Sequence, residues 1–221
     1  EETFEKQKTF IADASHELKT PLSVIIASSE ALEENKNEKK WLNNIKYEAE
    51  RMNDLITDLL ELSTSENKNI YTYEIGNLSK VVELSSLAFE GKAFENNIKL
   101  NLDIDKDIKI KMNENSIKEL IEILLDNAIK HSIKDGIITI SLKDNKNYVE
   151  LLVKNIGDEI PKDEEEKIFE RFYRIDKARN RKENRYGLGL AIAKNIVLNH
   201  NGKITASSLN NETTFKVLLK K

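Results

Sequence analysis

Apolar and small residues recur at alternating steps of three and four along the first third of the chain. This spacing places them on one stripe of a helix, and it predicts a helix from about residue 3 to Glu34. A second series predicts another long amphipathic helix after the polar turn at residues 34–37. The two stripes consist of Ile11, Ala14, Leu18, Pro21, Ile25, Ser28 and Leu32, and of Leu42, Ile45, Ala49, Met52, Ile56, Leu59 and Ser63.

Two long helices joined by a short turn predict an antiparallel hairpin. Because each helix carries a single apolar stripe, a lone hairpin leaves apolar surface exposed to water. Dimerisation into a four-helix bundle is the simplest way to cover that surface, and we therefore expect a homodimer through the helical hairpin. The alternative is that the hairpin packs against the second domain of its own chain.

A polar stretch at residues 65–69 predicts a boundary between a domain at residues 1–65 and a domain at residues 66–221. Beyond it, the helical and the strand periodicities are mixed. We expect strands near 70–75, 98–104, 108–112, 137–143 and 148–155, helices near 78–96, 116–131 and 187–199, and a terminal hairpin through 204–219. The predicted fold class is α+β, with the helical hairpin followed by a sandwich of helices on one side of a mixed sheet.

Composition narrows the possible functions. The 221 residues carry a net charge of −4, so nothing indicates nucleic-acid binding. Cysteine is absent, which excludes disulfides and thiolate metal sites. No apolar run approaches the roughly 18 residues of a membrane span, and no signal peptide is visible. Because the chain begins at Glu1 inside a helical pattern, we expect a soluble piece of a longer protein that makes no membrane contact itself.

The first candidate for chemistry is His16. It falls on the face of the first helix opposite to the apolar stripe, and Thr20 lies one turn further on the same face. Glu17 lies beside it at the flank. A single surface histidine is in most cases simply a solvated side chain, so His16 gains weight only from the rest of the chain.

The second candidate is Asn127, near the end of the predicted helix 116–131. Apolar residues cover so much of this helix that we expect Asn127 near the core side, where an amide needs a partner. It could be a buried structural amide or an oxygen ligand for Mg²⁺. Lys130 could contact a phosphate.

Further candidates follow the strand that ends at Asn155. This amide could bond to a nucleobase edge, and Gly157 would let the backbone approach closely, although a simple Gly-Asp turn explains the pattern equally well. An aromatic and basic segment precedes Gly187-Leu188-Gly189-Leu190. Two glycines at a helix N-terminus expose backbone N–H groups that suit a phosphate chain.

The order and spacing of these motifs identify a family. The chain resembles, over nearly its whole length, the catalytic core of a sensor histidine kinase of a two-component system. The phosphoacceptor motif is FIADASHELKTPL at residues 10–22, and the asparagine motif is LLDNAIK at 124–130. The motifs NIGDEI at 155–160, FERFYR at 169–174 and GLGL at 187–190 resemble the first glycine, the phenylalanine and the second glycine motifs of that family.

The resemblance implies a dimeric phosphoacceptor hairpin followed by a Bergerat-type ATP-binding domain, of the kind shared with Hsp90-like ATPases. His16 would take the γ-phosphate of ATP, and Glu17 would orient the ring and assist proton removal. Asn127 would hold Mg²⁺, and Arg174 would stabilise charge on the transferred group. Residues 158–186 would form a lid. The implied nucleotide-binding set is Asn127, Lys130, Asn155, Gly157, Tyr173, Gly187, Leu188 and Gly189.

The resemblance also implies a protein partner, namely the receiver domain of a response regulator whose aspartate accepts the phosphoryl group. Thr20 would orient a water molecule for the reverse, phosphatase reaction. The chain would be the cytoplasmic portion of a membrane-anchored bacterial sensor kinase.

The sequence departs from the family pattern at three places. Asn155 stands where the family usually has Asp, which leads to the hypothesis of weaker ATP binding. Ile123 stands where many relatives have a second Asn, so metal binding would depend more on Asn127. Residues 184–186 replace a glycine-rich run, in which Arg185 could contact phosphate or simply be solvated.

Two other functions fit part of this pattern. A dimerisation scaffold that has lost ATP binding or transfer would keep the motifs as elements of the fold. An ATPase of the chaperone or mismatch-repair type would share the nucleotide domain, but it would leave the hairpin and His16 unexplained.

Overall fold

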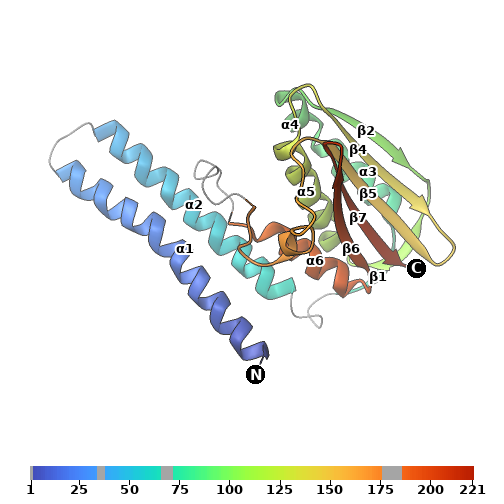
Figure 1. Ribbon diagram of the computed structural model, residues 1–221, viewed down its shortest axis with the longest axis horizontal. Coiled ribbons are helices and arrows are strands. Elements are labelled where there is room, and N and C mark those ends of the chain that lie inside the picture. Colours follow the sequence, from blue (N-terminus) through green and yellow to red (C-terminus); the bar gives the residue numbers. More distant parts are fainter. Residues whose placement is uncertain (1, 34–37, 66–71, 176–185) are drawn as a thin grey trace. The chain divides into compact units, whose positions relative to one another are not determined.

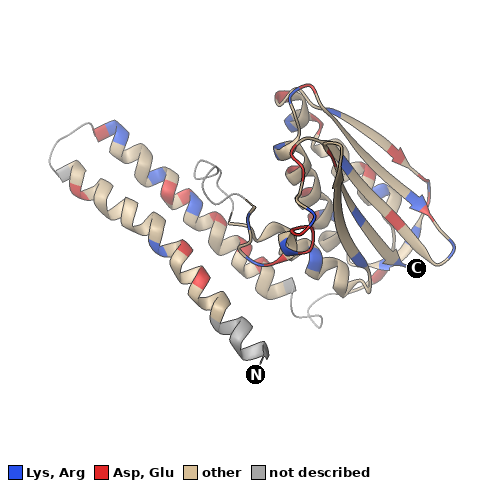
Figure 2. Cartoon of the chain, in the orientation of Figure 1, with Lys and Arg blue, Asp and Glu red and all other residues tan. Residues whose placement is uncertain are grey.

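The computed structural model describes residues 2–33, 38–65, 72–175 and 186–221. It divides into two compact units (Figure 1). Unit 1 comprises Glu1–Glu61 and Arg171–Leu188, and unit 2 comprises Leu62–Glu170 and Gly189–Lys221. The division into domains at residues 1–65 and 66–221 stays a prediction. Acidic and basic residues are interspersed along the helices and strands of both units (Figure 2), consistent with the small net charge of −4.

Unit 1 contains the first predicted long helix and most of the second, and the two run antiparallel (Figure 1). Helix α1 spans Glu2–Glu33 and continues through Pro21, and α2 spans Glu38–Ser65. The expected turn at residues 34–37 lies outside the described residues. Several large apolar side chains on both helices remain exposed, although others on the hairpin are buried. The exposed ones are Ile11, Leu22, Val24, Ile26, Leu42, Tyr47, Ile56 and Leu60.

Unit 2 is built on a five-stranded mixed sheet of order β2-β4-β5-β7-β6. The strands are β2 (Lys99–Ile104), β4 (Ile137–Asp144), β5 (Tyr148–Ile156), β6 (Lys203–Leu209) and β7 (Glu212–Lys220). Strands β2 and β4 are parallel, and the other neighbours are antiparallel. A mixed sheet was predicted, and the order of its strands is new information from the structure.

Four helices cover one face of this sheet (Figure 1). They are α3 (Leu78–Ala88), α4 (Glu90–Glu95), α5 (Glu114–His131) and α6 (Gly189–Asn199). Every second residue of β5 and β7 is buried, which forms apolar rows in the core. The rows are Val149, Leu151 and Val153 on β5, and Phe215, Val217 and Leu219 on β7. The α+β sandwich that the sequence predicted is confirmed.

Short elements complete unit 2. Strands β1 (Glu74–Asn77) and β3 (Lys109–Met112) pair as a small antiparallel ribbon. The strand expected at 70–75 therefore lies somewhat later, and residues 70 and 71 are outside the described part. A single 3₁₀ turn, η2 (Lys167–Phe169), lies in the charged stretch after β5.

The helix that we expected over residues 78–96 is interrupted at Phe89. The Ser86 hydroxyl donates to the Val82 carbonyl oxygen at 2.7 Å. The Phe89 N–H then bonds to the carbonyl oxygen of Ser86, which tightens the last turn. The apolar periodicity continues across this break, so the sequence pattern alone did not reveal it.

The helix expected from residue 187 begins two residues later, at Gly189. Gly187 has a φ of +75°, in the left-handed region that glycine tolerates and an α-helix does not contain. The first glycine of the GLGL motif is therefore part of the turn that precedes α6.

Candidate functional site

His16 lies exposed on α1, and its side chain makes no hydrogen bond to any residue that the structure describes. Glu17 is half-buried beside it. The Thr20 hydroxyl donates to the carbonyl oxygen of His16 at 3.3 Å. This bond places the Thr20 oxygen one turn from the imidazole, with its lone pairs available to accept from water. The sequence-based placement of these three residues on α1 agrees with the structure.

Asn155 lies at the end of the buried row of β5. It is 1% exposed and pairs across the sheet with Ile138 on β4 and Thr213 on β7. Its Nδ2 atom is buried and has no hydrogen-bond partner among the described residues. An unpaired buried amide destabilises a fold by about 1–3 kcal/mol, so this group is available to bind a ligand.

Gly157 lies where the chain leaves β5, and the backbone there is closely confined. A Cβ atom at this position would lie 1.7 Å from the carbonyl oxygen of His131. The Gly157 N–H donates to the Asn211 carbonyl oxygen at 2.8 Å, and an isolated bridge joins Gly157 to Ser132. The glycine therefore permits contact between the strand exit and the end of α5.

A chain of hydrogen bonds fixes the segment after Gly157. The Ile160 N–H donates to the Ser208 hydroxyl at 3.0 Å, and the Thr213 hydroxyl donates to the Asp158 carbonyl oxygen at 3.2 Å. The hydroxyls of Ser208 and Thr213 are 2.5 Å apart. Because the proton of the Thr213 hydroxyl goes to Asp158, the Thr213 oxygen is the acceptor in this pair, and the Ser208 hydroxyl donates to it.

The sequence analysis missed Ser208 and Thr213. A signal was present for Thr213, because it is the polar first member of the row Thr213, Phe215, Val217 and Leu219, which is otherwise apolar. No pattern in the sequence identified Ser208, since its role depends on the pairing of β6 with β7.

Helix α5 carries Asn127 and Lys130, and both are half-buried. Asn127 lies at the margin of the buried face rather than near the core, where we expected it, and it has no hydrogen-bond partner among the described residues. The buried polar residue of this turn is instead Asp126, which forms an ion pair with Lys92 of α4. Ile123 lies beside the start of α6, because a Cβ at Gly189 would be 3.5 Å from its Cγ2 atom.

The start of α5 is held by Asn113, whose side chain accepts from the Ser116 N–H at 2.9 Å. The Asn113 N–H in turn donates to Nε2 of His200 at 3.1 Å. The Nδ1 atom of His200 bonds to the Ile196 carbonyl oxygen at 2.7 Å, so the ring is neutral with its proton on Nδ1. Burial lowers the pKa of His200, and the bond to Ile196 offsets part of that effect.

The remaining predicted residues belong to unit 1. A Cβ at Gly187 would lie 2.7 Å from the Tyr173 carbonyl oxygen, and the Phe172 N–H donates to the Gly187 carbonyl oxygen at 3.1 Å. The backbone of Phe172 and Tyr173 therefore lies against this glycine. Tyr173 and Arg174 are half-buried, and Leu188 is buried.

Tyr186, one of the residues that depart from the family pattern, is buried in unit 1. Its hydroxyl donates to the Arg51 carbonyl oxygen of α2 at 3.2 Å. Burial raises the pKa of Tyr186, so the hydroxyl keeps its proton at neutral pH. Asn184 and Arg185 lie outside the described residues.

The predicted site residues thus fall into two groups. Unit 2 brings together Asn155 and Gly157 at the exit of β5, and places Gly189 against α5, the helix that carries Asn127 and Lys130. Unit 1 holds His16, Glu17, Thr20, Tyr173, Arg174, Gly187 and Leu188.

The fit of Mg²⁺ can be tested on the side chains. Within the described residues, no three His, Cys, Asp or Glu side chains cluster in a way that could hold a metal ion. Magnesium is commonly held by one or two protein oxygens together with substrate phosphates. The unpartnered amide oxygen of Asn127 fits that second mode, in which the ion arrives with a nucleotide.

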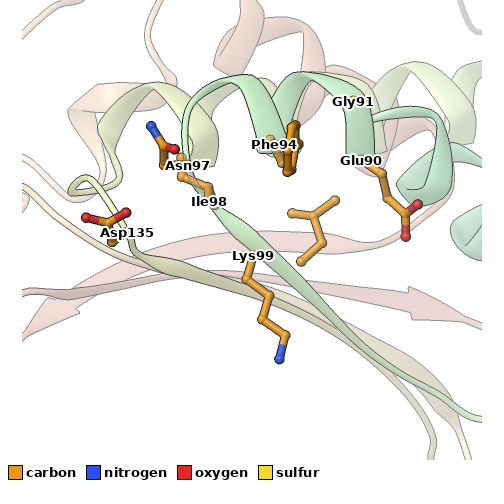
Figure 3. A pocket seen from close by; sticks show the side chains of 9 residues that line it. Glu90, Gly91, Phe94, Asn97, Ile98, Lys99 and Asp135 are labelled. Carbon is orange, nitrogen blue, oxygen red and sulfur yellow. The ribbon is translucent and has the colours of Figure 1, made fainter.

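A separate cavity of about 700 Å³ lies in unit 2 between α4, the start of β2 and Asp135 (Figure 3). Phe94 and Glu90 border it from α4, whereas the Lys99 side chain extends away from that helix. None of the residues that the sequence marks for nucleotide binding lines this cavity.

The described helices include none that is both long enough and apolar enough to cross a bilayer.

Two family models match the chain. Residues 6–68 match the His Kinase A (phospho-acceptor) domain, and residues 112–221 match the histidine kinase-, DNA gyrase B- and HSP90-like ATPase. Among curated proteins, the sensor protein DltS of Streptococcus agalactiae is 37% identical over 215 residues, which are 97% of this chain and 54% of DltS. The sensor histidine kinase WalK of Bacillus subtilis is 36% identical over 220 residues, which are 95% of this chain and 36% of WalK. The chain thus spans about half the length of DltS and about a third of the length of WalK.

A solved structure is similar over the whole chain. Histidine kinase ThkA, crystallised in complex with the response regulator protein TrrA, matches with a TM-score of 0.79 and 24% identity. The match covers 100% of this chain and 63% of that one. At this identity the likeness supports the fold.

Proposed function

Because the chain belongs to the family of two-component sensor histidine kinases, we propose that it transfers the γ-phosphate of ATP to His16. The phosphoryl group then passes to an aspartate on the receiver domain of a response regulator. The observation that carries this proposal is the exposed imidazole of His16 on α1, which has no hydrogen-bond partner among the described residues. Within those described residues, the second unit presents the buried Nδ2 atom of Asn155 without a partner.

The transfer uses one ring nitrogen of His16 as the nucleophile. Its lone pair forms the N–P bond while the bond between the γ-phosphorus and the β,γ-bridging oxygen breaks, and ADP leaves. Glu17 accepts a hydrogen bond from the other ring nitrogen, which fixes the tautomer and assists loss of its proton. Arg174 stabilises the negative charge on the transferred group.

The proposed contacts to the nucleotide are those that the family resemblance implies. Asn155 bonds to the base edge, and Gly157 leaves room for the backbone to approach it. Lys130, Tyr173, Gly187, Leu188 and Gly189 contact the nucleotide, with the N–H groups at the start of α6 directed to phosphate. Asn127 supplies an oxygen to Mg²⁺, which neutralises phosphate charge when it is bound with the nucleotide.

The hairpin also forms a homodimer in this proposal. Its support is the row of large apolar side chains that α1 and α2 leave exposed, Ile11 at 58% among them. A second copy that covers these side chains yields a four-helix bundle. The full-length protein is membrane-anchored, and this chain is its cytoplasmic portion.

A phosphatase activity toward the phosphorylated regulator completes the proposal. It is supported by the orientation of Thr20, whose hydroxyl proton goes to the His16 carbonyl oxygen. The oxygen of Thr20 can then accept a hydrogen bond from a water molecule that attacks the phosphoaspartate.

The test is incubation with γ-labelled ATP and Mg²⁺, beside the variants His16→Gln and Glu30→Gln. Glu30 is exposed on the same helix and outside the motif, so the second variant controls for the substitution itself. We expect label that is stable in base and labile in acid, present in the Glu30 variant and absent in the His16 variant.

Other outcomes distinguish the rival functions. Nucleotide binding without label would support a scaffold or a phosphatase without kinase activity. Steady release of labelled phosphate without a phosphoprotein would support a plain ATPase, which is already disfavoured by the match of residues 6–68 to the phospho-acceptor domain.

A further inference from the structure

We propose that Asn155 makes the nucleotide site accept 6-oxopurine triphosphates, such as ITP and GTP, in addition to ATP. The inference rests on the proposed function, because it assumes that the base of a nucleotide meets Asn155. The phosphoryl donors would then be purine nucleoside triphosphates and not ATP alone, and the side-chain amide of Asn155 would be the cause.

The position of Asn155 is well defined, whereas the orientation of its amide is not constrained. The backbone is fixed in the ladder between Ile138 and Thr213, and the side chain is 1% exposed. Yet Nδ2 has no hydrogen-bond partner among the residues that the structure describes. No hydrogen bond within that part of the chain therefore determines which end of the amide faces a ligand.

The side chain opposite Asn155 makes its hydrogen bonds to other residues. Thr213 lies directly across the ladder from Asn155. Its hydroxyl donates to the Asp158 carbonyl oxygen at 3.2 Å and accepts from the Ser208 hydroxyl at 2.5 Å. Because its donor is committed to Asp158, Thr213 does not compete with a base for the amide of Asn155.

An amide and a carboxylate read the 6-position of a purine differently. Adenine presents an amino donor there, and guanine and hypoxanthine present an oxygen acceptor. A carboxylate can only accept, so it bonds to the amino group and opposes the oxygen. An amide has both a donor and an acceptor, and it can therefore bond to either base.

The adjacent N1 atom strengthens this argument. Beside the amino group of adenine, N1 is an acceptor, and beside the oxygen of a 6-oxopurine, N1 carries a proton. An amide therefore pairs with both edges through two hydrogen bonds, after a rotation of 180° about its last torsion. Because this torsion is broad and two-fold, the rotation requires no movement of the backbone. Because Asn155 is 1% exposed, binding of a base to it requires that the side chains around it move.

The test measures displacement of a fluorescent ADP, labelled on the ribose with a methylanthraniloyl group, by ATP, ITP and GTP in the presence of Mg²⁺. ITP is included because it changes the 6-position without adding the 2-amino group of GTP. For the unmodified chain we expect the inhibition constants of ATP and ITP to agree within about tenfold. In Asn155→Asp the ratio should rise to about 100-fold or more in favour of ATP.

A matched control is Asn101→Asp, which makes the same change of charge at an exposed position of β2. This variant should keep the ratio of the unmodified chain. A second readout is transfer from γ-labelled GTP to the protein, which forms the same N–P bond, releases GDP and is lost in His16→Gln.

The possible results distinguish failure of this inference from failure of the proposed function. Tight ATP binding with ITP and GTP at least about 100-fold weaker in the unmodified chain would overturn this inference and leave the proposed function intact. An unchanged ATP-to-ITP ratio in Asn155→Asp would also overturn it, because another group would then read the base. If no nucleotide displaces the probe and none labels His16, both the inference and the proposed function are wrong.

Discussion

Gly157 and His131 meet so closely that a methyl group on the glycine would overlap the histidine carbonyl oxygen, at 1.7 Å. The Asp158 N–H donates to the same carbonyl oxygen at 3.3 Å. The exit of β5 is thus joined to the end of α5, the helix that carries Asn127 and Lys130. This backbone contact links the two parts of the candidate site within unit 2.

The first prediction follows from this contact. Gly157→Ala should destabilise unit 2 by about 1–3 kcal/mol or more, because the Cβ atom meets backbone that cannot easily move. Nucleotide affinity should fall with it, since the strand exit must shift away from α5. Urea unfolding and displacement of labelled ADP measure the two effects. Gly91→Ala is the control: apart from its chain neighbours and the backbone of its own helix, no atom of the described residues lies within 4 Å of its new Cβ. Alanine also favours the helix by about 0.5–1 kcal/mol.

The second prediction concerns the hydroxyl network after β5. Thr213→Val keeps the shape of the side chain but leaves the Asp158 carbonyl oxygen and the Ser208 hydroxyl without their partner. We expect a loss of about 1–3 kcal/mol in the free energy of unfolding. Thr214→Val, on the other face of the same strand, should change it by less than about 0.5 kcal/mol. Equal losses in the two variants would show that β-strand packing, and not the network, is the cause.

The third prediction is a dependence of stability on pH. Burial lowers the pKa of His200 below the ordinary value of 6.5, so the unfolded chain takes up a proton more readily than the folded chain. The stability from this residue is fully present above pH 6.5 and is lost as the pH falls below it. The slope is at most about 1.4 kcal/mol per pH unit for one proton.

Urea unfolding of the unmodified chain and of His200→Gln between pH 5 and 8 isolates this contribution. The difference in unfolding free energy between the two proteins should be constant above pH 6.5 and shrink towards pH 5. A difference that grows at low pH would mean that the folded state favours the charged ring, contrary to the bond that Nε2 accepts from Asn113.

The fourth prediction separates the proposed phosphatase role of Thr20 from a structural one. Thr20→Ala should slow hydrolysis of a receiver domain phosphorylated by this chain by about 100-fold, as expected for loss of a group that positions the attacking water. Thr20→Ser should restore the rate. The matched control is Thr57→Ala, which removes a hydroxyl with the same kind of bond, to the Asn53 carbonyl oxygen at 2.9 Å on α2. A similar loss in the control, or no loss in Thr20→Ala, contradicts the role.

Much of the fold could be predicted because its signals are local. The helices α1 and α2 follow from apolar stripes of 3.5-residue period, and β5 follows from strict alternation through Val149, Leu151 and Val153. The break at Phe89, where the Phe89 N–H bonds to the Ser86 carbonyl oxygen, was missed because the apolar periodicity continues across it.

For the candidate site, too, some features could be predicted from local sequence and others could not. Local sequence patterns are enough to place three groups on their elements: an imidazole opposite the apolar stripe of α1, an amide at the end of β5, and a glycine pair at the start of α6. These placements depend on helical and strand periods and on the conformational freedom of glycine, which are properties of neighbours in the chain.

Which of these groups have partners depends on the tertiary structure. Nδ2 of Asn155 has no partner among the described residues, and Thr213, brought opposite to it by the pairing of β5 with β7, bonds to Asp158 and Ser208 instead. Asp126, and not Asn127, is the buried polar residue of its turn, because Lys92 reaches it from α4. Hydrogen bonds and ion pairs act over a few ångströms between residues far apart in the sequence, so no local pattern encodes them.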